Sequence, residues 1–128
     1  MCIRDRGNHD VFVNLAGGAE AEEPAADLAV LAAVASSVRG VALPPSTAVF
    51  GEAGLLGEIR AVTDAPLRLK EAAALGFSRV LLPAGNASDA AGFPDLEVEP
   101  IATIADLLNG VRPLDIGKSR RISQYPKA

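Results

Sequence analysis

The 128-residue sequence has few of the residues from which metal centres, disulfides and base-stacking surfaces are built. Its single cysteine, Cys2, and single histidine, His9, provide neither a disulfide framework nor a set of sulfur and imidazole ligands. Tryptophan is absent and aromatic residues make up 4% of the chain, so few rings are available for stacking on bases or sugars. The composition therefore excludes a disulfide-rich scaffold and predicts no metal ligand.

Long apolar runs and nucleotide-binding motifs are also missing. The longest apolar stretch, 28–38, is shorter than the roughly 18 residues of a membrane-spanning helix. The start MCIRDRGNHD lacks the apolar segment of a signal peptide, so we expect a cytoplasmic location. No G-x-x-x-x-G-K-[ST] pattern occurs, and the glycine clusters at 17–18 and 51–57 lack the lysine and hydroxyl that contact phosphate and magnesium. We therefore expect no cofactor in this chain.

The chain does have enough apolar bulk for one domain. Hydrophobic residues make up 49% of it, mostly alanine, leucine and valine. The net charge of −4 is unevenly spread, because residues 118–128 carry four cations and no acid, and the rest carries the other eight cations with all 16 acids. An acidic body of this kind binds a phosphate backbone poorly by charge alone.

Local patterns predict alternating strands and helices. Runs rich in β-branched and apolar residues predict strands at 10–16, 47–51, 55–62, 79–83 and 96–101. Helices are expected at 24–38, 66–75 and 103–111, with Pro24 in the first turn, Gly40 as a C-terminal cap and Thr103 as an N-cap. A polar loop is expected at 85–94. This order predicts an α/β domain with a mixed sheet.

The two ends of the chain differ from this domain. Residues 1–9 show dense charge without periodicity, and MCIRDR is similar to translated sequencing-adapter sequence. We therefore predict a non-native or disordered leader at 1–9, with the true protein extending upstream. The domain is predicted at 10–112, and a disordered basic tail at 113–128.

Four stretches carry a resemblance to a known family. They are DVFVNLAGG (10–18), EPAADLAVLAAVASS (23–37), LPPSTAVFGEAGLLGEIRAV (43–62) and RLKEAAALGFSRVLLPAGN (68–86). On these stretches the chain resembles the C-terminal domain of the RadA (Sms) family of bacterial DNA repair proteins, which is similar to the proteolytic domain of Lon. The resemblance implies the Lon-type α/β fold, like that of domain 2 of ribosomal protein S five.

The resemblance also implies a longer parent protein. Such proteins carry a zinc finger and a RecA-like ATPase ahead of this domain, so ATP, Mg and Zn would belong to upstream domains. They form hexameric rings on single-stranded or branched DNA, act beside a recombinase of the RecA type, and use no membrane. The expected function is a non-catalytic Lon-like domain that supports ring assembly and DNA engagement during recombinational repair and branch migration.

Peptidase chemistry is the main alternative for a Lon-like domain. It requires a serine nucleophile and a lysine that accepts its proton. By resemblance these positions map to Ala25 and about Pro66, neither of which carries the required group. Ser36 or Ser37 with Lys70 is a weak substitute, because such serines commonly bond back to their own helix. We predict no catalytic residue; the open alternatives are a Lon-like serine peptidase fragment and the homologous domain of a magnesium-chelatase-like ATPase.

Two surfaces are candidates for non-catalytic roles. Subunit contacts, which the resemblance implies, are expected at polar residues in strands or tight turns, namely Asn14, Glu52, Glu58 and Arg60. Contacts to the DNA backbone are expected at the cations Arg39, Arg60, Arg68, Lys70 and Arg79. The alternative for both sets is solvated charge, with a cross-strand ion pair worth less than about 1 kcal/mol.

Overall fold

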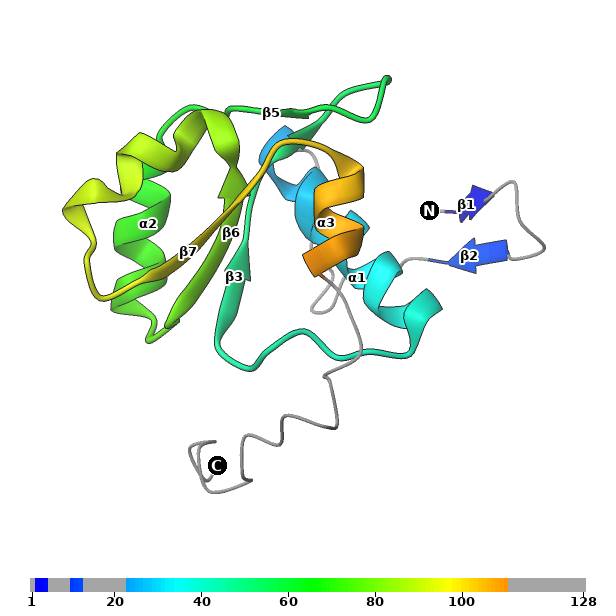
Figure 1. Ribbon diagram of the computed structural model, residues 1–128, viewed down its shortest axis with the longest axis horizontal. Helices are drawn as coiled ribbons and strands as arrows, with labels where there is room; N and C mark the ends of the chain where they lie inside the picture. Colours follow the sequence, from blue (N-terminus) through cyan, green and yellow to red (C-terminus); the bar gives the residue numbers. More distant parts are fainter. Residues whose placement is uncertain (1, 5–9, 13–22, 111–128) are drawn as a thin grey trace.

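The computed structural model describes residues 2–4, 10–12 and 23–110 (Figure 1). A parallel sheet of order β3-β6-β7 lies at the centre of this part. It comprises β3 (Thr47–Val49), β6 (Arg79–Pro83) and β7 (Glu97–Ile101). The middle strand β6 is a continuous apolar run after its first residue, as is typical of a parallel strand covered on both faces.

Helices cover both faces of this sheet (Figure 1). On one face, α1 (Asp27–Arg39) and α3 (Ile104–Gly110) share a core cluster with Leu81 of β6. On the other face, α2 (Ala65–Ala74) and the neighbouring 3-10 segment η3 (Ala84–Gly92) pack with Val80 and Leu82. Successive side chains of a strand point to opposite faces, so one short strand supplies both clusters. The predicted α/β class is confirmed.

The helix ends follow the predicted caps. Gly40 ends α1 in the left-handed conformation at φ 63°, and the N–H of Val41 bonds back to the carbonyl of Ser36 at 3.0 Å. At the start of α3, the Thr103 hydroxyl accepts a hydrogen bond from the Asp106 N–H, and the Asp106 carboxylate accepts one from the Thr103 N–H. This reciprocal capping box confirms Thr103 as the N-cap.

The prediction of a single strand at 55–62 is wrong, because this segment forms the turn and the return arm of a hairpin. The hairpin pairs β4 (Glu52–Ala53) with β5 (Ile59–Arg60) in antiparallel register, Glu52 opposite Arg60. Gly57 adopts φ 85° in the turn, a conformation that favours glycine. The apolar pair Leu55-Leu56 suggested strand, but the glycines on either side interrupt the ladder and place both leucines in the turn.

Two further segments differ from the prediction. The expected polar loop at 85–94 is largely the 3-10 segment η3, which packs against α2 and β7. No element was expected in the first nine residues, yet β1 (Cys2–Arg4) pairs antiparallel with β2 (Asp10–Phe12). The rest of the predicted strand at 10–16, including Asn14, and the predicted tail at 113–128 lie outside the described residues.

Candidate functional site at the helix starts and the hairpin

Ala25, at the mapped serine position, is a buried residue in the 3-10 turn η2 (Pro24–Ala26) that leads into α1. Its carbonyl accepts a hydrogen bond from the Gly51 N–H at 2.8 Å, and the Gly51 carbonyl accepts one from the Leu28 N–H at 3.0 Å. A Cβ atom at Gly51 would lie 3.0 Å from the Leu28 side chain, so the space beside this turn is already filled. Ala25 therefore sits at a tightly packed joint between η2, α1 and the end of β3.

Pro66, at the mapped lysine position, is exposed in the first turn of α2. The two mapped positions belong to segments that meet in space, because Arg68 Nη2 lies 2.9 Å from Glu23 Oε1. Glu23 stands two residues before Ala25, and Arg68 two residues after Pro66. The ion pair between Glu23 and Arg68, which are 45 residues apart in sequence, thus joins the two segments to which the serine and the lysine of a Lon-type dyad map.

The substitute pair of a serine with Lys70 is not assembled. Ser36 donates its hydroxyl hydrogen bond to the Val41 carbonyl at the C-terminal end of α1. Lys70 is exposed on α2, which covers the opposite face of the sheet from α1. The structure therefore does not bring Ser36 or Ser37 to Lys70.

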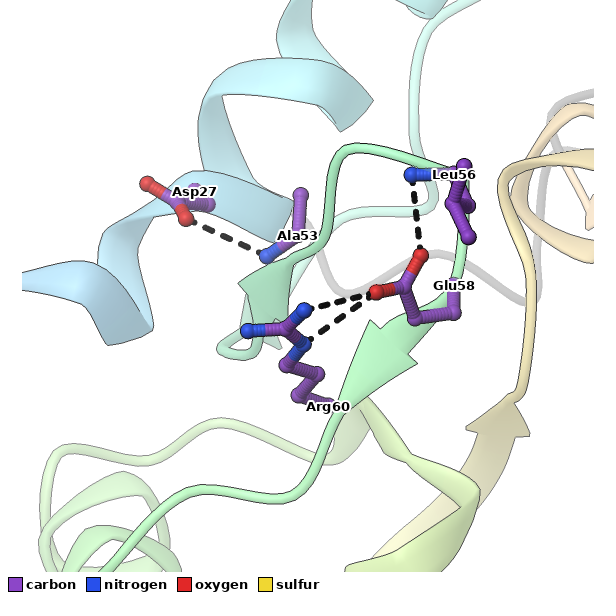
Figure 2. A network of polar contacts seen from close by, with 5 residues as sticks. All are labelled: Asp27, Ala53, Leu56, Glu58 and Arg60. Carbon is purple, nitrogen blue, oxygen red and sulfur yellow. Dashed lines mark hydrogen bonds and ion pairs between the residues drawn. The ribbon is translucent and has the colours of Figure 1, made fainter.

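The β4–β5 hairpin carries a network of polar contacts around Glu58 (Figure 2). Glu58 Oε1 accepts hydrogen bonds from Arg60 Nε at 3.2 Å and Nη2 at 2.9 Å, and Oε2 accepts one from the Leu56 N–H at 3.0 Å. A Cβ atom at Gly54 would lie 1.8 Å from Oε1, so glycine makes room for the carboxylate. Glu58 and Arg60 share one face of the return arm, as the alternation predicted, and the carboxylate holds the turn at Leu56.

Asp27 fixes the base of the same hairpin to the first turn of α1. Its Oδ2 atom accepts a hydrogen bond from the Ala53 N–H at 3.1 Å, as Figure 2 shows. The return arm is bonded to the segment before α3, because the Ile59 N–H donates to the Ala102 carbonyl at 2.9 Å. The sequence indicated Asp27 only as an acid near a helix start. Its hydrogen bond to Ala53 joins residues 26 apart, and no local sequence pattern indicated that bond.

Titration of Glu58 gives a testable prediction about the turn. Its pKa lies below the ordinary value because its own backbone N–H, the Arg60 guanidinium and the Leu56 N–H bond to the charged form. Because folding lowers this pKa, the charged carboxylate stabilises the hairpin at pH values above the ordinary pKa of a glutamate. This stabilisation is lost as the pH falls through the lowered pKa. We expect the NMR amide shift of Leu56 to titrate at that lowered pKa and to lose this transition in Glu58→Gln.

The matched control for this titration is Glu71→Gln, which changes an exposed glutamate on α2. It should leave the Leu56 transition unchanged. A Leu56 transition that persists in Glu58→Gln, or that occurs at the ordinary pKa of a glutamate, would contradict the network.

The five predicted DNA-binding cations come from α1, β5, α2 and β6 rather than from one element. Three of them hold carboxylates: Arg60 pairs with Glu58, Arg68 with Glu23, and Arg79 with Glu99. Arg79 also lies 4.0 Å from Glu97, which ties the starts of β6 and β7 together. Arg39 and Lys70 are exposed. The ion pairs give three of these cations a defined structural role within the domain.

Within residues 2–4, 10–12 and 23–110, no group of three or more histidine, cysteine, aspartate or glutamate side chains is arranged to hold a metal ion. None of the helices in that same part of the chain is both long enough and apolar enough to cross a membrane.

Comparison with known families agrees with this architecture. The family model of the Lon protease (S16) C-terminal proteolytic domain matches residues 4–111. The chain therefore belongs to the family of Lon C-terminal proteolytic domains.

Within that family, the chain is similar to bacterial proteins named DNA repair protein RadA. It is 54% identical over 80 residues to the one from Brucella abortus, covering 62% of this chain and 17% of the relative. It is 46% identical over 101 residues to that of Aquifex aeolicus, covering 79% and 22%, and 42% identical over 108 residues to that of Haemophilus influenzae, covering 84% and 23%. The predicted resemblance is confirmed, and the chain spans about a fifth of the length of these relatives.

Proposed function

We propose that this chain is the non-catalytic Lon-like domain of a RadA-type DNA repair ATPase, acting in the cytoplasm in recombinational repair and branch migration. In this role it supports ring assembly and DNA engagement by upstream domains that would hold ATP, Mg and Zn. The observation that carries the proposal is the state of the two mapped dyad positions. Ala25 is buried, Pro66 replaces the base, and an ion pair between Glu23 and Arg68 joins their flanks.

The chemistry of these side chains favours a non-catalytic domain. Hydrolysis of a peptide bond needs a nucleophile and a base within hydrogen-bond reach of each other. The methyl group of Ala25 cannot attack a carbonyl, and the ring of Pro66 has no atom that accepts a proton. What the fold retains, in the part of the chain that the structure describes, is a scaffold of three α-helices, a sheet and a braced hairpin. Assembly is a function that needs only the surfaces of such a scaffold.

DNA engagement is proposed to be weak in each copy. The chain is acidic, and Arg60, Arg68 and Arg79 already hold carboxylates. A ring repeats each contact around one DNA molecule, so contacts that are weak singly add up through effective concentration. Binding of this kind depends on phosphate charge and weakens steeply with added salt.

A chimera tests the proposed function in a full-length setting. The region of Aquifex aeolicus RadA that aligns with this chain is replaced by the matching residues of this chain, and the original protein and a version without this region serve as controls. We expect light scattering to give the chimera the same assembled mass as the original protein. Its DNA-stimulated ATPase rate should lie within about twofold of the rate of the original protein. The version lacking the region is expected to lose the assembled state.

Two results with the chimera would overturn the proposal, and two further observations would favour the alternatives. A folded chimera that stays monomeric, or assembles without responding to DNA, contradicts the supporting role. Hydrolysis of casein by the isolated chain that disappears in Lys70→Ala would instead support the peptidase alternative. An upstream sequence without a four-cysteine zinc finger ahead of a P-loop would favour the magnesium-chelatase-like alternative.

A further inference from the structure

The C-terminal end of α3 carries a chemically reactive pair of residues, Asn109-Gly110. The sequence holds four asparagines, at positions 8, 14, 86 and 109, and Asn109 is the one followed by glycine. In such a pair the backbone nitrogen of the glycine reaches the asparagine side chain easily, because glycine has no Cβ atom to obstruct the approach. A pair of this kind loses its side-chain amide without an enzyme wherever the backbone is free to rotate.

Asn109 lies beyond the capping box and the buried residue that anchor α3. It is exposed, in the last turn of a helix of seven residues. A helix of this length is not stable by itself, and α3 depends on the contacts of Thr103 with Asp106 and on Leu107, which is 1% exposed. These anchors precede Asn109, and helix ends open before helix centres. The last turn can therefore open while the domain stays folded.

We propose that Asn109 is a site of spontaneous deamidation. When the last turn opens, the Gly110 backbone nitrogen gives its proton to hydroxide and attacks the Cγ carbon of Asn109. The new C–N bond closes a cyclic succinimide, while the bond from Cγ to the side-chain nitrogen breaks and this nitrogen takes up a proton and leaves as ammonia. Water then opens the ring at one of its two carbonyl carbons, which gives either an aspartate or an isoaspartate. The net reaction exchanges the NH2 group for OH, and no oxidant or reductant takes part.

Asn86 is the internal contrast, because its side-chain amide is held by several hydrogen bonds. It is 5% exposed, accepts the Val62 N–H at 2.9 Å, and donates to the Val62 carbonyl at 3.1 Å and to Asp89 at 3.0 Å. Attack on its Cγ carbon requires these bonds to break and a buried group to become exposed. The fold therefore protects Asn86 and leaves Asn109 open to reaction.

The product places a negative charge where α3 tolerates it poorly. The C-terminal end of a helix carries partial negative charge, and a carboxylate at position 109 lies one turn after Asp106 on the same side of α3. The isoaspartate form also adds a carbon to the backbone, which interrupts the helical repeat. Deamidation therefore loosens α3, whose first residue, Ile104, bonds to the Gly57 carbonyl in the hairpin turn at 2.9 Å.

The reaction is tested in the 128-residue chain carrying Ala87→Gly, which gives Asn86 the same following residue as Asn109. The chain is incubated at mildly alkaline pH, either folded or unfolded in urea, and peptide mapping by mass spectrometry follows both asparagines. Folding should slow the reaction at Asn109 by less than about tenfold, because a helix end opens readily. Folding should slow the reaction at Asn86 by more than about a hundredfold, because a buried group opens far more rarely. Gly110→Ala should slow the reaction at Asn109 several-fold in both states.

Equal protection of the two asparagines by folding would overturn the proposal, as would a slowing at Asn109 of about a hundredfold or more. An unchanged rate in Gly110→Ala would also overturn it, because the Gly110 nitrogen would then not be the attacking group. Circular dichroism shows whether the Ala87→Gly chain is folded. If it is not, the slowing of the reaction at Asn109 by folding of the wild-type chain decides alone.

The consequence for α3 is measured with Asn109→Asp, which carries the charge of the product, and with Asn109→Gln as its uncharged control. Hydrogen exchange reports on α3 at the Leu107 N–H, which donates to the Thr103 carbonyl at 3.2 Å. Exchange there should be about two- to tenfold faster in Asn109→Asp than in Asn109→Gln. Equal exchange in the two variants would show that the charge does not loosen α3.

Discussion

Replacement of Leu28 by alanine is expected to lower the free energy of unfolding by about 2–5 kcal/mol. Leu28 is fully buried in the core cluster that joins α1 to Leu81 of β6 and Ile101 of β7. Its side chain also lies against Gly51, where even one added methyl group would crowd it. Removal of its side chain leaves a cavity that α1 cannot close without moving, because its backbone N–H is bonded to the Gly51 carbonyl.

Urea unfolding followed by circular dichroism measures this loss as a shift in the midpoint at an unchanged m value. Leu75→Ala is the matched control, since it removes the same atoms from a side chain that is 73% exposed. It should change the free energy of unfolding by no more than about 0.5 kcal/mol. Equal effects of the two substitutions would mean that α1 is not packed on the sheet in the way described.

Most of the central fold was predictable from local patterns. The strand β6 has the predicted bounds of 79–83, and α2 and α1 begin and end within a few residues of prediction. These elements carry strong local signals: a continuous apolar run in β6, a proline in the first turn of α2, and glycine after α1. The capping box at Thr103 was partly predictable, because threonine is a favoured N-cap.

The site depended on contacts that local sequence does not encode. The ion pair of Glu23 with Arg68 spans 45 residues, and the bond from Ala53 to Asp27 spans 26. The hairpin was missed because Leu55 and Leu56 have the composition of a strand while lying in a turn. Glycine at 54 and 57 was the available signal for that turn, and the room that Gly54 leaves for the Glu58 carboxylate became visible only in three dimensions.

Asn86→Leu is expected to destabilise the domain by about 1–3 kcal/mol, because it leaves two part-buried backbone groups of Val62 without their partners. Asn86 is 5% exposed, and its side chain accepts the Val62 N–H at 2.9 Å and donates to the Val62 carbonyl at 3.1 Å. It also donates to Asp89 at 3.0 Å. A leucine side chain of similar size fills the space but forms none of these bonds. Urea unfolding measures the loss, with the exposed neighbour Ser88→Ala as a control that should stay near wild type.

The position of Val62 gives Asn86 a consequence beyond stability. Val62 lies in the short connection between β5, which ends at Arg60, and α2, which begins at Ala65. Asn86 therefore fixes the segment that joins the hairpin to α2. Asn86→Leu should therefore speed amide hydrogen exchange in the hairpin, at the Gly54 N–H that bonds to the Glu58 carbonyl, even at temperatures where the chain stays folded. Unchanged exchange at this amide in a folded Asn86→Leu chain would show that the hairpin does not depend on this connection.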